Sequence, residues 1–292
     1  MSDLLIDAIQ LARMLEQPDT LVLDVRYDLF NPAAGRQAYE QSHIPGAVFV
    51  ELEKVMSGSK NGRNGRHPLP DRSAFIQSMR QLGMTPSTRV VVYDAANSMA
   101  ASRLWWMLRW IGHTQIHVLD GGWAAWLEAG QVTDNQSMRF AEPVHSLAGA
   151  MPDDTPSAMP VYSVEFIEAH LNDPRWRLLD ARAPERYRGE TEPIDPVAGH
   201  IPGALNWPNS RNLAANNRFR PAHELRADYL ELLKDHPVDR LIHQCGSGIS
   251  ACHNLLAMEV AGLPGSALYA GSWSEWCSDS RRPIATGNEP QA

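Results

Sequence analysis

Three short motifs occur twice in this chain, in the same order and at nearly the same separation. Each half of the 292-residue sequence contains Asp-x-Arg, then His-Ile-Pro-Gly-Ala, then Gly-x-Trp. The copies lie 156, 157 and 150 residues apart, measured from Asp24 to Asp180, His43 to His200 and Trp123 to Trp273. Solenoid arrays have periods of about 20–50 residues, so this spacing indicates two copies of one domain.

The length of the chain agrees with a duplicated domain, since roughly 150 residues is a common domain size. We predict an N-terminal domain at residues 1–143, a linker at 144–160 and a C-terminal domain at 161–292. The linker prediction rests on the proline and acidic residues at 151–156. Such a composition is typical of a semi-extended connection between domains.

Strand-like and helix-like segments alternate within each half. The strand-like runs are 21–25, 90–93 and 117–119 in the first half and 178–180, 241–244 and 267–269 in the second. The helix-like runs include 73–82, 99–111 and 249–261. This alternation predicts an α/β fold in which each domain is a parallel sheet flanked by helices. Ligands of such folds bind beyond the carboxyl ends of the strands.

Composition excludes several classes of function. A net charge of −8 argues against nucleic-acid binding, and no run approaches the ~20 apolar residues of a membrane span. The first seven residues carry no basic charge, so we expect no signal peptide. Three cysteines without a Cys-x-x-Cys spacing suit a reducing cytoplasm, and they predict neither disulfides nor a metal. We therefore expect a cytoplasmic protein with no cofactor, no nucleic-acid partner and no membrane partner.

A cysteine opens the small-residue loop at 244–250, which reads Gln-Cys-Gly-Ser-Gly-Ile-Ser. The loop follows a strand-like run and precedes a helix-like one, so its backbone N–H groups and the positive helix end favour an anion. That anion is first the thiolate of Cys245 and then an anionic substrate beside it, which predicts a nucleophilic cysteine. Cys252, two helical turns further on, is expected to be a small core residue.

The doubled motif pattern resembles the rhodanese superfamily, as two tandem domains that cover essentially the whole chain. The resemblance implies sulfur transfer through a persulfide on a cysteine of the C-terminal copy, here Cys245. It also implies an inactive N-terminal copy. Asp94 stands at the position aligned with Cys245 and cannot carry sulfur.

Within this superfamily, the loop after Cys245 resembles that of 3-mercaptopyruvate sulfurtransferases. Thiosulfate-preferring members usually carry Arg and Lys there, and this loop is uncharged. The resemblance therefore implies 3-mercaptopyruvate as sulfur donor, with thiosulfate as the runner-up. The acceptor would be cyanide or a thiol such as that of thioredoxin. The loop residues expected to bind the donor are Gly246, Gly248, Ile249 and Ser250.

The resemblance also implies a relay of Ser, His and an acid that assists proton movement. By position, these residues are Ser247, His67 and Glu53, with Glu51 as an alternative acid. His67 and the acids are encoded in the N-terminal half, so we expect them to meet Ser247 across the domain interface.

An arginine that pairs with the substrate carboxylate is also part of the resemblance, and Arg186 matches it. A planar guanidinium binds a carboxylate bidentately, which a lysine cannot do. Mercaptopyruvate enzymes commonly carry a second arginine a few residues on, where this chain has Asp195. Either Arg188 substitutes for it, or the site holds the carboxylate with one arginine.

Two other functions share some of these features. A cysteine-dependent phosphatase needs an arginine after Cys-x5 to stabilise the phosphoryl group, and this chain has Ala251 there. A non-enzymatic sulfur-carrier or regulatory module would form the persulfide on Cys245 without rapid turnover. The presence of Ser247, Arg186 and His67 favours an enzyme.

Overall fold

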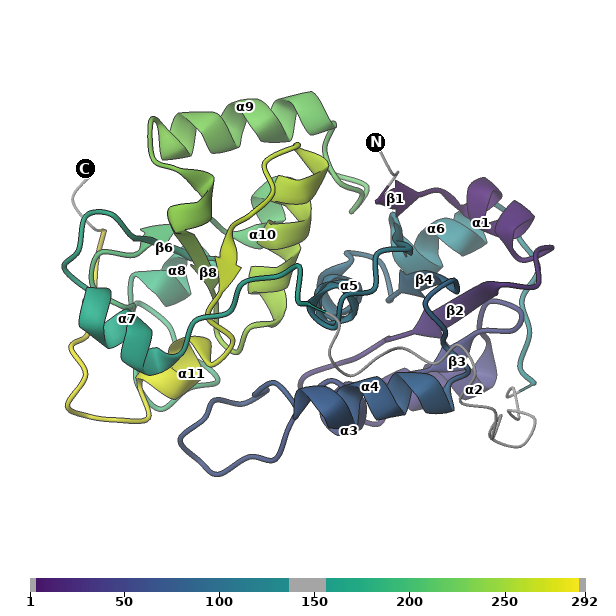
Figure 1. Cartoon of the computed structure of the whole chain (residues 1–292), viewed down its shortest axis with the longest axis horizontal. Coiled ribbons are helices and arrows are strands. Elements are labelled where there is room, and N and C mark those ends of the chain that lie inside the picture. The colour runs from purple at the N-terminus through teal and green to yellow at the C-terminus, as the bar shows by residue number, and fades with distance from the viewer. Residues whose placement is uncertain (1–3, 137–155, 289–292) are drawn as a thin grey trace. The chain divides into compact units, whose positions relative to one another are not determined.

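A computed structural model describes residues 4–136 and 156–288 of the chain. These residues belong to two compact units, each with its own sheet (Figure 1). Of the described residues, the first unit comprises 4–58, 70–136, 156–158 and 215–218, and the second comprises 59–69, 159–214 and 219–288. Most of the predicted linker at 144–160 lies outside the described residues. The segment 59–69 comes from the N-terminal half of the sequence and is part of the second unit.

The first unit is built around a five-stranded parallel sheet in the order β1-β5-β4-β2-β3. Its strands are β1 (Leu5–Ile6), β2 (Thr20–Asp24), β3 (Val48–Phe49), β4 (Arg89–Tyr93) and β5 (Ile116–Leu119). Its helices are α1 (Ala8–Met14), α2 (Ala34–Gln41), α3 (Leu52–Val55), α4 (Arg72–Gln81), α5 (Met99–Trp110) and α6 (Gly122–Glu128). One face of the sheet packs Val22, Val91 and Tyr93 against α1 and α6.

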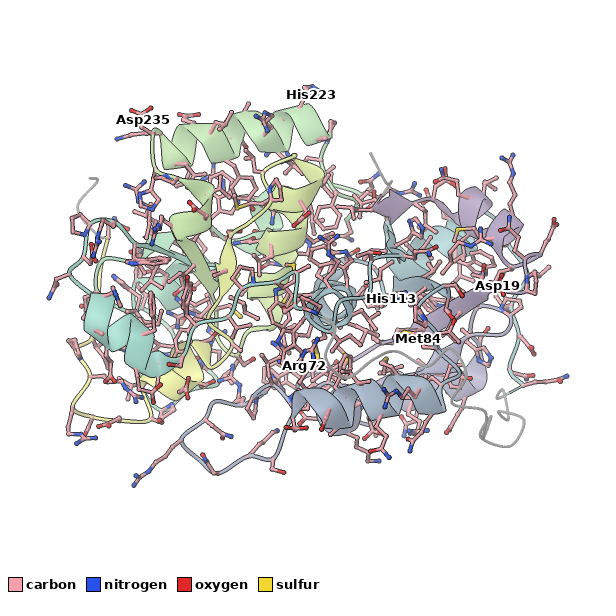
Figure 2. The ribbon with its side chains drawn as sticks, in the orientation of Figure 1. Asp19, Arg72, Met84, His113, His223 and Asp235 are labelled. Carbon is pink, nitrogen blue, oxygen red and sulfur yellow. The ribbon has the colours of Figure 1, made fainter. Side chains whose placement is uncertain are left out.

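The second unit contains a four-stranded parallel sheet in the order β7-β6-β8-β9. Its strands are β6 (Arg177–Asp180), β7 (Leu205–Asn206), β8 (Leu241–Gln244) and β9 (Ala267–Leu268). Its helices are α7 (Val164–His170), α8 (Pro184–Tyr187), α9 (Ala222–Leu233), α10 (Ile249–Val260) and α11 (Ser272–Trp276), with 3-10 turns at η1 (Asn209–Asn212) and η2 (Val238–Arg240). Figure 2 marks the ends of α9 with His223 and Asp235, which are both exposed.

The two sheets have equivalent topologies, which confirms the predicted duplication. Starting from the edge strands β3 and β7, the order β3-β2-β4-β5 in the first unit corresponds to β7-β6-β8-β9 in the second. The first sheet has β1 as an additional strand beside β5. The strand-like and helix-like runs predicted from the sequence coincide with these elements to within one or two residues. Each unit is the α/β parallel sheet flanked by helices that the alternating pattern predicted. Among the described residues, no helix combines the length and apolar character needed to cross a membrane.

The repeated Asp-x-Arg and Gly-x-Trp motifs form one buried cluster in each unit. In the second unit, Arg182 donates to both carboxylate oxygens of Asp180, with a shortest distance of 2.7 Å. Its guanidinium carbon lies 4.8 Å from the ring centroid of Trp273, within the range of a cation–π contact. In the first unit, Arg26 makes the same ion pair with Asp24. These contacts give the two motifs a structural role.

The His-Ile-Pro-Gly-Ala motif is also structural. His200 is fully buried and stacks on Tyr187, with ring centroids 3.8 Å apart. The hydroxyl of Tyr187 donates to the carbonyl of Ala204, at the end of the motif. The first copy, at His43, stacks in the same way on Tyr39. Each motif ties the chain that enters one edge strand to the preceding helix.

The two faces of the second sheet bury different side chains. Leu178 and Ile242 pack with α7 and α11 on one face. Since side chains alternate along a strand, His243 of β8 points to the opposite face, where α10 packs on this strand. His243 is fully buried, and neither ring nitrogen has a hydrogen-bond partner among the described residues. Burial lowers the pKa of His243 to about 3.

The pKa of His243 makes the stability of the protein depend on pH. An unfolded histidine has a pKa of about 6.5, so between pH 6.5 and 3 only the unfolded chain takes up this proton, and stability falls as the pH falls. From pH 7 to pH 5, the wild type should lose about 2 kcal/mol more unfolding free energy than His243→Leu. Urea denaturation at both pH values measures this difference. The exposed His223→Leu variant is the control, and an identical pH dependence in His243→Leu would contradict the prediction.

Candidate active site

The loop after β8 places Cys245 at the carboxyl end of a central strand. Its side chain is 2% exposed, and the N–H of Gly248 donates to its sulfur at 3.1 Å. Gly248 has φ +79°, a left-handed conformation that glycine adopts without strain, and it caps the start of α10. The carbonyls of Cys245 and Gly246 accept N–H groups from Trp273 and Ser274 of α11. The loop is therefore held by its hydrogen bonds to α11 and by its connection to α10, and the sulfur of Cys245 lies at the N-terminus of α10.

The first unit has a carboxylate where the second has the cysteine. Asp94 follows β4 directly and is 4% exposed. Its Oδ1 accepts from the N–H groups of Ala96 and Ser98, and its Oδ2 from those of Ala100 and Ala101, at 3.0–3.3 Å. Burial raises the pKa of Asp94, although these four N–H groups act in the opposite direction. The anion-binding loop of the first unit is thus occupied by its own side chain.

The predicted relay residues Ser247 and His67 are brought together. A hydrogen bond of 2.8 Å joins Oγ of Ser247 and Nδ1 of His67, and both residues are buried. We predicted this contact across a domain interface, whereas segment 59–69 is part of the second unit itself. The N–H of Arg66 donates to Oγ of Ser274, which anchors the segment on α11.

The two candidate acids lie in the first unit. Tyr27 donates its hydroxyl to Oε1 of Glu53 at 3.0 Å. Glu51 pairs with Arg36 and Lys54, and the hydrogen bond from Arg36 lowers the pKa of Glu51. A carboxylate held in two ion pairs is poorly suited to orient a histidine, so Glu53 stays the preferred prediction for the acid.

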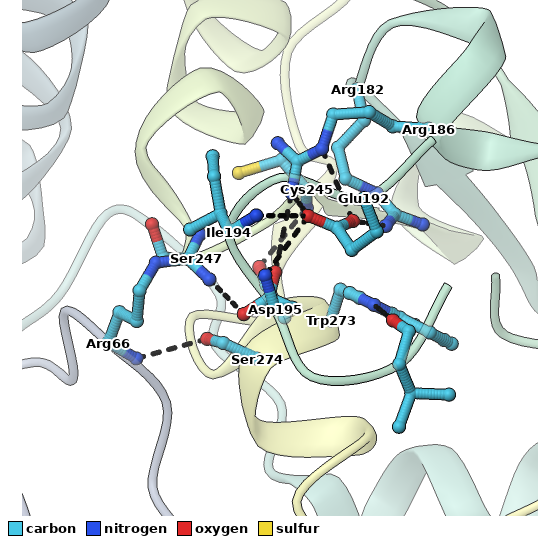
Figure 3. Close-up of polar contacts among 12 residues, drawn as sticks. Arg66, Arg182, Arg186, Glu192, Ile194, Asp195, Cys245, Ser247, Trp273 and Ser274 are labelled. Carbon is cyan, nitrogen blue, oxygen red and sulfur yellow. Dashed lines mark hydrogen bonds and ion pairs between the residues drawn. The ribbon is translucent and has the colours of Figure 1, made fainter. Parts of the chain in front are cut away.

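Charged side chains of alternating sign run from the sheet to the loop (Figure 3). This network begins at the Asp180–Arg182 pair and continues through Glu192. Oε2 of Glu192 lies 3.5 Å from Nη1 of Arg182, and its Oε1 lies 2.6 Å from Nη2 of Arg186. Arg186 also contacts Asp195 at 3.3 Å, and Asp195 in turn pairs with Arg66. The acidic side chains of this network are at most 3% exposed.

Mutual pairing keeps these buried groups charged. Burial alone would lower the pKa of Arg182, but Asp180 raises it, with smaller contributions from Glu192 and Cys245. Burial would likewise raise the pKa of Glu192, but hydrogen bonds from Arg186 and from two backbone N–H groups hold it below its usual value. The network therefore presents fixed guanidinium groups near the cysteine.

The second arginine considered in the sequence analysis, Arg188, is placed differently. Nε and Nη2 of Arg188 both donate to the carboxylate of Glu190, and the two side chains are 30% and 55% exposed. An exposed pair of this kind contributes little to the stability of the fold. The expectation that Arg188 replaces a missing arginine therefore gains no support from its contacts.

Sequence analysis overlooked Arg66 and Glu192. Glu192 is the link between the Asp180–Arg182 pair and Arg186. The signal for Arg66 was its position directly before His67, together with an acid at 195 that needs a buried partner. Asp195 is 129 residues from Arg66, so no local pattern reveals that pair. Glu192 is only 6 residues from Arg186 and 10 from Arg182, but the spacing of these charges does not by itself show that they are buried together.

The other two cysteines lie in the protein core. Cys252 is fully buried, and its thiol donates to the carbonyl of Gly248 at 3.2 Å. Burial raises the pKa of Cys277 to about 11, and the neighbouring Asp195 acts in the same direction. Neither thiol is suited to nucleophilic attack. Within residues 4–136 and 156–288, no cluster of three His, Cys, Asp or Glu side chains could hold a metal ion.

The occupied loop of the first unit makes Asp94 a stability determinant. In Asp94→Asn, an NH2 group replaces one of the two carboxylate oxygens. The two backbone N–H groups that donate to this oxygen in the wild type then have no acceptor. We expect the unfolding free energy to fall by about 1–3 kcal/mol. Urea denaturation measures the change, with the exposed Asp19→Asn as control. A midpoint equal to that of the wild type would show that the loop does not depend on this carboxylate.

Comparison with known proteins agrees with this geometry. The model of the rhodanese-like domain matches residues 7–129 and 163–279. The chain is 44% identical to a "probable 3-mercaptopyruvate sulfurtransferase" of Pseudomonas aeruginosa, over 97% of this chain and 98% of the relative. It is 35% identical to the thiosulfate sulfurtransferase of Cricetulus griseus, over 89% and 85% of the two chains. The structure of 3-mercaptopyruvate sulfurtransferase from Leishmania major aligns with a TM-score of 0.83 at 27% identity, over 97% of this chain and 76% of that chain. This chain is therefore a member of the rhodanese family, with two rhodanese-like domains.

Proposed function

We propose that this protein is a sulfurtransferase that takes sulfur from 3-mercaptopyruvate and passes it on through a persulfide of Cys245. The observation that carries the proposal is the hydrogen bond of 2.8 Å between Ser247 and His67. Ser247 follows Cys245 by two residues in the loop. The hydrogen bond adds a proton-transfer pair to a nucleophile at a helix N-terminus.

In the first half-reaction, the Cys245 thiolate attacks the sulfur of 3-mercaptopyruvate. An S–S bond forms as the C–S bond breaks, and the electron pair of the broken bond leaves on carbon as the enolate of pyruvate. The enolate then takes a proton and departs as pyruvate. We assign delivery of this proton to Ser247 and His67, with Glu53 as the acid of the relay.

Donor binding is assigned to the start of α10 and to Arg186. The N–H groups of Gly246, Gly248, Ile249 and Ser250 lie in the loop and first helical turn, where backbone donors have no helical partner. Arg186 supplies a guanidinium for the carboxylate, held in place by Glu192 and Asp195.

In the second half-reaction, an acceptor takes the outer sulfur and regenerates the Cys245 thiolate. A thiolate acceptor, such as that of thioredoxin, becomes a persulfide, and cyanide becomes thiocyanate. We propose that the first unit does not turn over, because Asp94 fills its loop. The three free cysteines support a reducing, cytoplasmic setting.

Thiosulfate is the second candidate donor, because the relative from Cricetulus griseus is named a thiosulfate sulfurtransferase. The two donors differ in their leaving groups. Sulfite leaves from thiosulfate as a stable anion, whereas the enolate of pyruvate needs a proton on carbon. The Ser247–His67 pair therefore favours 3-mercaptopyruvate.

The persulfide tests the nucleophile directly. After treatment with 3-mercaptopyruvate, the intact mass of the protein should increase by one sulfur atom, and Cys245→Ser should show no increase. Cys277→Ser is the matched control, because burial raises the pKa of the Cys277 thiol to about 11 and this thiol should not accept sulfur. Turnover at the wild-type rate in Cys245→Ser would refute the assignment.

The relay predicts an effect that depends on the donor. His67→Ala and Ser247→Ala should each lower kcat/KM for 3-mercaptopyruvate by about 100-fold or more, because a proton-transfer group typically supplies this factor. The double variant should be little worse than either single one, because the pair acts as a unit. With thiosulfate, all three variants should stay within a few-fold of the wild type.

Steady-state kinetics with both donors measures these effects, and the exposed His223→Ala serves as control. Equal losses with both donors would mean that the pair only shapes the loop. Wild-type kinetics in His67→Ala would remove the histidine from the mechanism.

A further inference from the structure

Arg66 stands where the sequence lacks a second donor-binding arginine. The resemblance led us to expect a cation at position 195, and the chain has an aspartate there. Asp195 is almost fully buried and pairs with Arg66, which comes from the segment at 59–69 (Figure 3). We propose that Arg66 is a specificity-determining residue that holds the donor carboxylate together with Arg186. The inference rests on the proposed function and names a further residue of the same site.

The position of Arg66 above the loop supports this role. A Cβ atom built on Gly246 would lie 2.8 Å from Nη2 of Arg66 and 3.6 Å from both terminal nitrogens of Arg186. The two guanidinium groups therefore lie on the same side of the loop, beside the residue that follows Cys245. The backbone of Gly246 does not have a positive φ, so a side chain there would not strain the backbone, but it would have to displace the end of the Arg66 side chain.

Both arginines retain unused donors at this place. Nη1 of Arg66 bonds to Asp195, while its buried Nε has no partner among the described residues. Within residues 4–136 and 156–288, no hydrogen bond involves Nη2 of Arg66 or Nη1 of Arg186. An N–H group that lies beside an anion-binding loop without an acceptor is free to bind a ligand carboxylate.

The backbone around Arg66 is held in place, and this restricts the Arg66 guanidinium to the neighbourhood of the loop at Gly246. Its N–H donates to Oγ of Ser274 at 3.0 Å. A Cβ on the neighbouring Gly65 would lie only 2.7 Å from the carbonyl oxygen of Gly271, and φ of Gly65 is +83°. Segment 59–69 therefore lies against the turn before α11, which fixes where the Arg66 side chain starts.

Asp195 has a defined part in this arrangement. Its two oxygens bind Arg66 and Arg186, one each, so it separates two like charges that would otherwise repel each other. Position 195 therefore holds a counterion for two arginines and does not bind the donor itself.

Kinetics of Arg66→Ala test the proposal. Removing a charged hydrogen-bond donor to a carboxylate should raise KM for 3-mercaptopyruvate by about 10–100-fold, with kcat within a few-fold of the wild type. The inhibition constant of pyruvate, which carries the same carboxylate, should rise in parallel. Arg63→Ala is the matched control, since Arg63 is exposed in the same segment.

Two further variants keep the test valid if Arg66→Ala leaves Asp195 poorly paired. Arg66→Ala/Asp195→Asn removes the orphaned charge and should show the same rise in KM. Gly246→Ala introduces a Cβ that displaces the Arg66 guanidinium, so it should raise KM in the wild type but add little in the Arg66→Ala background. Additive effects of Gly246→Ala and Arg66→Ala would contradict the close approach.

The outcomes separate this inference from the proposed function. Wild-type protein that does not turn over 3-mercaptopyruvate would refute the proposed function. Active wild type with an unchanged KM and an unchanged pyruvate constant in Arg66→Ala would refute the inference alone. A loss in kcat without a change in KM would also refute it, because Arg66 would then act only by positioning His67.

Discussion

The buried ion pair between Asp180 and Arg182 is the contact on which the site of the second unit depends. It lies at the carboxyl end of β6, where burial would be costly for either charge alone. Trp273 covers the guanidinium, and Glu192 extends the network toward Arg186. The charges beside the loop of Cys245 are thus connected to the core of the domain by paired groups. Such a network restrains the arginine side chains before any ligand binds.

The two units present different side chains in equivalent loops of one scaffold. Four strands of each sheet have the same order, and both units contain the Asp–Arg–Trp cluster. At the equivalent loop position, Asp94 accepts four backbone N–H groups in the first unit, and the sulfur of Cys245 accepts one in the second. An anion-binding loop favours any anion at that point. The side chain after the strand therefore decides how many of the backbone N–H groups of the loop already have an acceptor.

The groups to which we assign donor recognition are separated in sequence. The loop at 245–250 carries no charged residue, which by itself favours a donor with a single negative charge. Folding brings Arg66 and Arg186 beside that loop, so the charge of the site is not that of the loop. In the proposed mechanism, the choice between 3-mercaptopyruvate and thiosulfate therefore rests on proton transfer at Ser247 and not on loop charge alone.

The sequence by itself determined the duplicated α/β fold, its central strands and the loop at Cys245. These features follow from local patterns: apolar strand-like runs, small residues between a strand and a helix, and motifs repeated at one spacing. Tertiary structure alone decided that His67 reaches Ser247 within one unit, and that Asp195 pairs with Arg66. These partners are 180 and 129 residues apart. The pairing of distant charges depends on which segments fold against each other, and no periodicity along the chain records that.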